Sequence, residues 1–153
     1  LALKPSLIVA DEPVSALDVS IQAQVVNLLR DLQEQLGLSY LFISHDLSVV
    51  GHVSHRIAVM YLGKIIEVST RQTLLTSPLH PYTEMLIGSI PLPSPKQKRK
   101  RRKMVVGEIP SPINMPKGCR FHPRCPIAVS RCQSEVPRLR EITSKHVVAC
   151  HLK

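Results

Sequence analysis

Two adjacent acids, Asp11 and Glu12, directly follow the short apolar run of residues 7–10. A fully apolar run of this kind predicts a strand that is buried on both faces, as in a parallel sheet. Ligands of open α/β sheets bind at the carboxyl ends of the strands. There one carboxylate could hold Mg²⁺ and the other could polarise a water that attacks a phosphate. Taken alone, such an acidic pair favours an ordinary loop, so the residues that follow decide its interpretation.

A histidine completes the set of candidate residues. His45 follows a second apolar run, residues 40–43, and is preceded by a loop and helix that contain Ser15 and Asp18. Consecutive strands of a parallel sheet can end side by side. We therefore expect His45 to approach the same phosphate as Glu12.

Helical and extended segments around these residues predict an α/β fold. A helix is indicated by apolar residues at helical spacing, with Asp18 or Ser20 as its cap and Gly37 at its end. Gly63 and Lys64 predict the turn of a hairpin between residues 57–62 and 65–68. Short helices broken by prolines are expected over residues 70–90. The strand–helix–strand order favours a layered α/β domain with parallel strands and packed helices. The apolar helical positions are Ile21, Val25, Leu28, Leu29 and Leu32.

Three ordered segments resemble motifs of ABC ATPases. Residues 7–13 (LIVADEP) resemble the Walker B motif, residues 15–18 (SALD) the D-loop, and residues 43–47 (ISHDL) the switch-histidine segment. Residues 16–20, 40–50, 59–63 and 80–83, with the tail around Cys119 and Cys125, are similar to the oligopeptide and dipeptide importer ATPases. The resemblance covers nearly the whole chain and implies the C-terminal part of an ABC-type nucleotide-binding domain.

The resemblance implies a role for each candidate residue. Asp11 would support Mg²⁺, Glu12 would be the catalytic base, and His45 would contact the γ-phosphate of ATP. Ser15 and Asp18 would communicate across a nucleotide-sandwich dimer. The implied partners are a second ABC ATPase subunit, two membrane-spanning permease subunits and an external peptide-binding protein, with this subunit on the cytoplasmic face of the membrane.

Three motifs of the resembled family are absent from this sequence. There is no G-x-x-x-x-G-K-[S/T] phosphate loop, no glutamine loop and no Leu-Ser-Gly-Gly-Gln signature. We therefore expect a C-terminal fragment or an N-terminally truncated product that does not hydrolyse ATP alone. Its expected parts are residues 1–90 of the ATPase domain, a Pro-rich basic linker over 91–117, and a four-cysteine tail over 118–153.

Four cysteines, all in the tail, are candidate metal ligands. They follow the spacing C-x5-C-x6-C-x17-C. Disulfides are disfavoured if the domain is cytosolic, and the C-x2-C pairs typical of zinc sites are absent. A [4Fe–4S] cluster takes four thiolates with varied spacing, and many importer ATPases of this subfamily carry a similar tail. Zinc and four reduced thiols remain alternatives. His122, His146 and His151 are alternative ligands, although each is interpreted first as a surface histidine. The predicted ligands are Cys119, Cys125, Cys132 and Cys150.

The net charge of +9 comes mostly from one segment, since residues 96–103 contribute seven cations. Such blocks are usually solvated linkers, and this one has no aromatic residue to stack on bases. We therefore expect no nucleic-acid partner, although contact with anionic lipid is plausible. The alternatives to a peptide-importer ATPase are a non-enzymatic nucleic-acid-binding module and a degenerate regulatory remnant.

Overall fold

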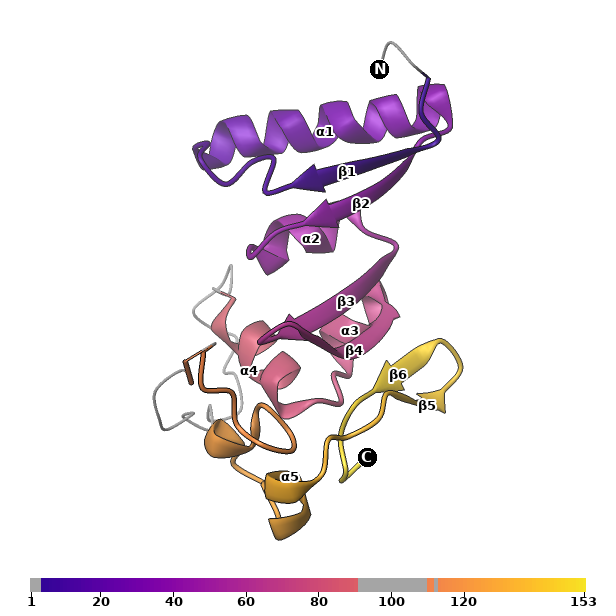
Figure 1. The fold of residues 1–153 in the computed structure, drawn as a ribbon. Helices are drawn as coiled ribbons and strands as arrows, with labels where there is room; N and C mark the ends of the chain where they lie inside the picture. The colour runs from indigo at the N-terminus through magenta and orange to yellow at the C-terminus, as the bar shows by residue number, and fades with distance from the viewer. Residues whose placement is uncertain (1–3, 91–109, 112) are drawn as a thin grey trace, which may run out of the picture. The chain divides into compact units, whose positions relative to one another are not determined.

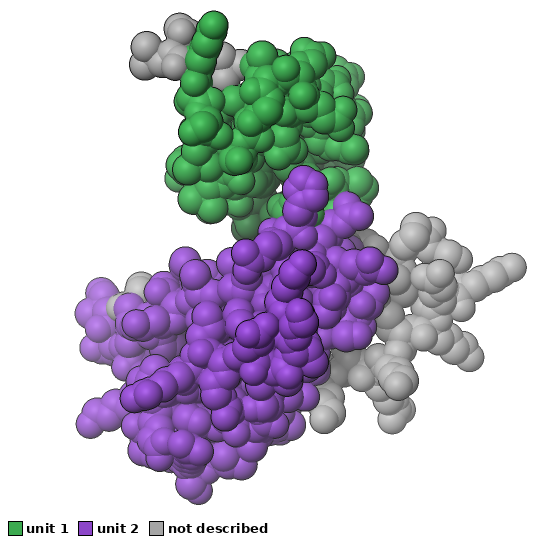
Figure 2. All heavy atoms as spheres, turned by 90° about the vertical axis from the view of Figure 1, so that its right-hand side faces the viewer, with its two compact units in different colours: residues 1–54 green, residues 55–153 purple. Residues whose placement is uncertain are grey.

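The computed structural model describes residues 4–90, 110–111 and 113–153 of the 153-residue chain. The chain divides into two compact units, residues 1–54 and residues 55–153, which are coloured separately in Figure 2. The predicted α/β class is confirmed by the mixture of strands and helices in Figure 1. Most of the expected basic linker, including residues 96–103, lies outside the described residues, and the predicted division into three parts stays a prediction.

The first unit is a strand–helix–strand–helix segment. It comprises β1 (Leu7–Asp11), α1 (Val19–Leu36), β2 (Ser39–Ile43) and α2 (Leu47–Val53). The two strands pair in parallel, with Val9 beside Leu41 and Asp11 beside Ile43 (Figure 1). Because parallel strands share a direction, the residues that follow both strands lie at the same edge of the sheet.

Helix α1 begins and ends at residues that the sequence identifies. The carboxylate of Asp18 accepts hydrogen bonds from the backbone N–H groups of Ser20 and Ile21, so Asp18 is the cap and Ser20 is not. Gly37 ends the helix in the left-handed conformation, with φ of 64°. Helix α2 was not expected from the sequence, and Asp46 caps it in the same way as Asp18 caps α1.

Among the described residues, one face of the β1–β2 sheet is covered. Val14, Val26 and Val49 form a buried cluster, against which Val25, Phe42 and Val53 pack. The opposite face exposes Leu7, Val9, Leu41 and Ile43 by 45–59%. The expectation of strands buried on both faces is therefore wrong for the part of the chain that the structure describes, where the buried cluster packs on the face of Phe42.

The second unit contains an antiparallel sheet and several short helices. Its strands are β3 (Arg56–Tyr61), β4 (Lys64–Thr70), β5 (Arg140–Thr143) and β6 (His146–Val148), in the order β3-β4-β6-β5. Its helices are α3 (Arg71–Thr76), α4 (Pro81–Ser89), the 3₁₀ turn η1 (His122–Arg124) and α5 (Ser130–Ser134). No helix in the described ranges is long and apolar enough to cross a membrane.

The hairpin and the short helices over residues 70–90 are confirmed with small shifts. The turn between β3 and β4 falls at Leu62 and Gly63, both with positive φ, one residue earlier than expected. Two successive positive φ values are typical of the tight turns that join antiparallel strands. Pro81 begins α4 instead of breaking a helix, since proline is tolerated in the first helical turn.

The cysteine-bearing tail belongs to the same unit as the hairpin. Strand β6 pairs with β4, and the N–H of Ala149 donates to the carbonyl of Ile66 at 2.8 Å. The ring of Phe121 packs edge-on against Tyr61 and Tyr82, with centroids 5.2 and 5.5 Å away. Phe121 is 1% exposed, so the start of the tail contributes directly to the core of this unit.

Candidate functional site

The structure brings Glu12 and His45 together at the carboxyl edge of the parallel strands. The ring nitrogen Nδ1 of His45 lies 3.0 Å from Oε1 of Glu12. An ionised carboxylate can only accept a hydrogen bond, so Nδ1 donates and Nε2 is left for another partner. The side chains are 48% exposed for Glu12 and 73% exposed for His45, so both are accessible from solvent.

Glu12 has an unusual backbone conformation. Its φ is 45°, in the left-handed region that a residue with a side chain rarely adopts. Its N–H donates to the carbonyl of Ile43 at 2.9 Å, and its carbonyl accepts from the N–H of Ser15 at 3.3 Å. The hydroxyl of Ser15 also donates to this carbonyl, at 3.1 Å. Such strain costs about 1–3 kcal/mol and persists only where the surroundings determine the conformation, as these hydrogen bonds do.

Asp46, the residue after His45, is held in place by hydrogen bonds. The carboxylate of Asp46 accepts from the hydroxyl of Ser48 and from the N–H groups of Ser48 and Val49, which lowers the pKa of Asp46. The N–H of Asp46 in turn donates to Ser44 Oγ at 3.1 Å. His45 therefore lies between two anchored residues, which fixes its backbone opposite Glu12.

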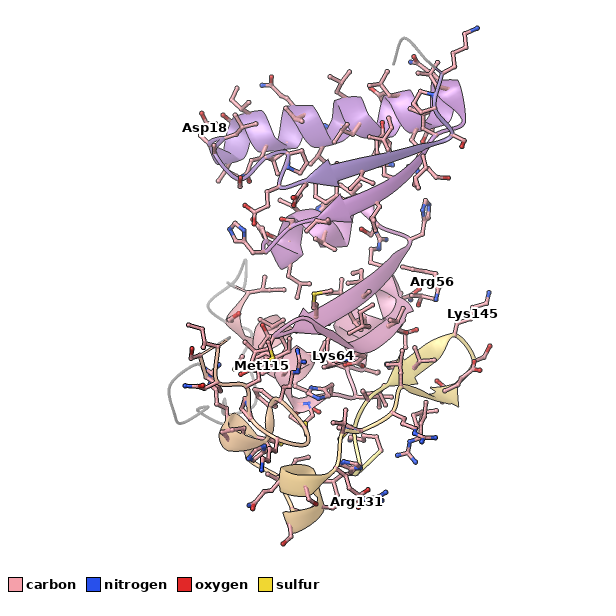
Figure 3. The ribbon with its side chains drawn as sticks, in the orientation of Figure 1. Asp18, Arg56, Lys64, Met115, Arg131 and Lys145 are labelled. Atoms are coloured by element: carbon pink, nitrogen blue, oxygen red, sulfur yellow. The ribbon has the colours of Figure 1, made fainter. Side chains whose placement is uncertain are left out.

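The other predicted nucleotide-site residues lie on the same short stretch of chain. Asp11 is the last residue of β1 and is exposed. Asp18 lies at the amino end of α1, where Figure 3 labels it. Hydrogen bonds from the Ser20 hydroxyl and the Ile21 N–H lower the pKa of Asp18, so its carboxylate is ionised and occupied with the helix. The carboxylates of Asp11 and Glu12 are the ones available for new ligands.

The acids Asp11 and Glu12, with His45, could bind a metal ion and accept a proton. Exposed, adjacent carboxylates are oxygen donors of the kind that Mg²⁺ takes, so the chemistry of Asp11 fits that ion. A carboxylate that accepts one hydrogen bond from an imidazole can accept a proton from water at its second oxygen. Acids and a histidine at the carboxyl edge of parallel strands are consistent with a phosphate-transfer site.

The four cysteines are near one another but do not form a ready metal site. Burial raises the pKa of the Cys119 thiol, and the thiols of Cys132, Cys125 and Cys150 raise it further. Burial also raises the pKa of Cys125. Within the described part of the chain, however, no group of three or more His, Cys, Asp or Glu side chains is placed to hold a metal ion. The metal site on these four thiols therefore stays a prediction.

A buried polar cluster that the sequence did not reveal lies in the second unit. Glu67 is fully buried, and Oε1 of Glu67 lies 2.6 Å from Nε2 of His146. The same carboxylate accepts from the N–H groups of Leu79 at 2.7 Å and His80 at 2.9 Å. The interpretation of His146 as a surface histidine is wrong, because strand pairing between β4 and β6 places it beside Glu67. His122 and His151 are partly exposed.

The mixed α/β fold is consistent with the C-terminal part of an ABC ATPase domain, and comparison with known proteins agrees with it. Residues 66–132 match the family described as oligopeptide/dipeptide transporter, C-terminal region. A probable peptide ABC transporter ATP-binding protein from Sinorhizobium fredii is 58% identical over 153 residues, which cover 100% of this chain and 43% of that protein. The oligopeptide transport ATP-binding protein AppF from Bacillus subtilis is 56% identical over 153 residues, covering 99% of this chain and 46% of that protein.

A third relative gives the same result. A putative peptide import ATP-binding protein from Brucella ovis is 56% identical over 150 residues, covering 98% of this chain and 47% of that protein. The resemblance stated from the motifs is thereby confirmed along the whole chain: it is a relative of the ATP-binding subunits of peptide ABC transporters. The chain spans less than half the length of each of these relatives.

Proposed function

We propose that these 153 residues supply part of the hydrolytic site of an ATP-hydrolysing subunit that energises peptide import. The observation that carries the proposal is the pair formed by Glu12 and His45, 3.0 Å apart at the carboxyl edge of β1 and β2. The names of the relatives support the choice of ATP as ligand and peptide as cargo. The subunit would act at the cytoplasmic face of the membrane.

Each residue has a role that its chemistry can perform. Glu12 accepts a proton from the attacking water, and His45 orients Glu12 through Nδ1 and presents Nε2 to a phosphate oxygen. Asp11 would hold Mg²⁺, which supplies neutralisation of phosphate charge when bound. Ser15 and Asp18 would face a second ATPase subunit. In this proposal Glu12 carries out the proton transfer and His45 contacts the negatively charged phosphate.

The proposed assembly follows the importer architecture. It comprises a second, related ATPase subunit, two membrane-spanning permease subunits and an external peptide-binding protein. By itself the 153-residue chain is not expected to turn over ATP, because its sequence contains no phosphate loop. ATP turnover by the purified chain above that of a Glu12→Gln variant would contradict this expectation.

Uptake of a labelled peptide tests the cellular function. The intact subunit containing these residues is expressed with its permease and binding-protein partners, and His45→Ala is compared with His52→Ala. Both histidines are exposed, but only His45 contacts Glu12. Loss of uptake with His45→Ala alone supports the proposal, whereas equal uptake by both variants contradicts it.

We also propose a metal centre on Cys119, Cys125, Cys132 and Cys150, with [4Fe–4S] preferred over zinc. The support is that four thiols lie within one short tail. The thiols of Cys132, Cys125 and Cys150 are close enough to Cys119 to raise its pKa. Metal content and visible absorption of the chain purified without oxygen test it, with Cys125→Ser for comparison. About four irons per chain support a cluster, a single zinc supports the alternative, and no metal contradicts both.

Nucleic-acid binding and a regulatory remnant are less well supported. A nucleic-acid-binding module does not account for the pairing of Glu12 with His45, and the relatives found are ATP-binding subunits. We therefore keep ATP hydrolysis as the proposed function.

A further inference from the structure

Gln22 contacts the loop that joins the catalytic candidate Glu12 to helix α1. Its side-chain Nε2 donates to the carbonyl of Val14 at 3.0 Å and to the carbonyl of Leu17 at 3.1 Å. Both partners are backbone acceptors in the loop between β1 and α1. Since carbonyl oxygens can only accept, the donor must be the NH₂ end of the amide, which fixes the orientation of the side chain.

The position of Gln22 in the helix explains why it can reach back. Gln22 lies in the first turn or so of α1, which begins at Val19. In an α-helix each Cα–Cβ bond tilts toward the amino end, so a side chain here covers the segment that precedes the helix. A long side chain with two N–H donors at this position can therefore bind two carbonyls of the preceding loop.

The loop is held by hydrogen bonds at its start and by packing at its centre. At its start, the carbonyl of Glu12 accepts from the N–H and the hydroxyl of Ser15. At its centre, Val14 is 2% exposed and packs in the core of the first unit. The carbonyl of Val14 also accepts from the N–H of Leu17 at 3.2 Å, and Gln22 supplies the second hydrogen bond to this oxygen. Gln22 thus ties this loop to the helix, together with the carboxylate of Asp18.

We propose that Gln22 is a positioning residue for hydrolysis: by binding the carbonyls of Val14 and Leu17 it fixes the loop that sets the strained backbone of Glu12 and the direction of its carboxylate toward His45. The inference rests on the proposed function and adds to it a residue that none of the motifs contains. Gln22 does not touch the reacting atoms, so its effect is on the rate of the step and not on nucleotide affinity.

The first test uses the 153-residue chain and nuclear magnetic resonance. Gln22→Glu keeps the shape but removes both donors, Gln22→Arg keeps several donors, and Gln24→Glu is the matched control on the exposed face of α1. We expect Gln22→Glu to shift the backbone resonances of Glu12, Ser15 and Leu17 while those of the remainder of α1 stay in place. Gln22→Arg and Gln24→Glu should leave the loop resonances close to wild type.

The second test measures ATP turnover by the intact subunit carrying the same substitutions. Gln22→Glu should lower kcat by about tenfold, a small effect beside the 10²–10⁴ of a general base, with KM for ATP unchanged. Gln22→Arg should restore most of the rate. Should Gln22→Glu prevent folding, Gln22→Met, which also lacks donors, takes its place in both tests.

The outcomes separate this inference from the proposed function. Loop resonances and kcat equal to those of Gln24→Glu overturn the role of Gln22, and so does a loss of signal spread over all of α1, which indicates a merely structural residue. If Glu12→Gln leaves turnover unchanged, the proposed function fails whatever Gln22 does. If Glu12→Gln abolishes turnover but Gln22→Glu does not change it, only the inference on Gln22 fails.

Discussion

Glu67 on β4 and His146 on β6, 79 residues apart in the sequence, are joined by a 2.6 Å contact between Oε1 and Nε2. Both side chains are almost fully buried, with exposures of 0% and 3%. The carboxylate also binds the N–H groups of Leu79 and His80, so a single buried acid connects the hairpin, the start of α4 and the tail. Several properties of the second unit depend on this arrangement.

Replacing Glu67 should strongly destabilise the second unit. Glu67→Ala leaves three buried donors without their acceptor, and each buried donor left unsatisfied costs about 1–3 kcal/mol. Urea denaturation followed by near-ultraviolet circular dichroism measures the change. Glu135→Ala is the control, because the exposed ion pair of Glu135 with Arg131 contributes at most about 1 kcal/mol. Equal losses for the two variants would show that the buried cluster is not a stabilising connection.

Acidification should weaken the same unit through His80. Burial lowers the pKa of His80 from 6.5 to about 4, although the nearby carboxylate of Glu67 partly raises it. Its Nδ1 accepts a hydrogen bond from the N–H of Tyr82 at 3.1 Å and caps α4, which requires the neutral ring. Between pH 6.5 and about pH 4, His80 therefore binds a proton in the unfolded chain but not in the folded chain.

The contribution of neutral His80 to the free energy of unfolding should be complete above pH 6.5 and should be lost as the pH falls to about 4. The loss amounts to up to about 3 kcal/mol, at 1.36 kcal/mol per unit of pKa. Unfolding free energy measured between pH 7 and pH 4 checks this, and His80→Asn, which can cap the helix without titrating, should flatten the dependence. His52→Asn, at an exposed position, should leave the dependence intact.

Removing the cap of α1 should weaken the first unit moderately. Asp18→Ala removes the acceptor for the N–H groups of Ser20 and Ile21, which destabilises the first turn of the helix. Amide hydrogen exchange in the first turn of α1 should speed up accordingly. Asp31→Ala, at an exposed position within the same helix, should change exchange there little, and a similar effect from both variants contradicts the capping role.

A methyl group at Gly118 should disrupt the packing of the tail. A Cβ there would lie 2.5 Å from the carbonyl oxygen of Cys132, and the φ of 68° disfavours any residue with a side chain. Gly118→Ala should therefore lower the thermal midpoint of the second unit by several degrees, the size expected for about 1–3 kcal/mol. Gly88→Ala is the control, because its Cβ would meet no atom within 4 Å.

Local signals in the sequence predicted the first unit well. The apolar runs before Asp11 and Ser44, the cap at Asp18 and the left-handed Gly37 all depend on neighbouring residues, and the structure has each where expected. The meeting of Glu12 with His45 follows from parallel pairing of two consecutive strands. These features need no knowledge of distant contacts.

Long-range pairing explains what the sequence did not predict. His146 appears polar and solvent-exposed in sequence, and only the pairing of β6 with β4 places it against Glu67. Gln22 carries no motif signal, because its role depends on the course of the preceding loop. The exposure of Val9 and Leu41 likewise depends on which elements cover a sheet face, and an apolar pattern alone does not reveal this.

ATP turnover by the intact subunit, compared between Glu12→Gln and Glu34→Gln, tests the central claim most directly. Both residues are exposed glutamates of the first unit, but only Glu12 contacts His45. The account predicts that Glu12→Gln lowers kcat at least about 100-fold with ATP binding retained, while Glu34→Gln matches wild type. Wild-type turnover by Glu12→Gln would contradict the assignment of Glu12 as the base and remove the basis of the proposed site.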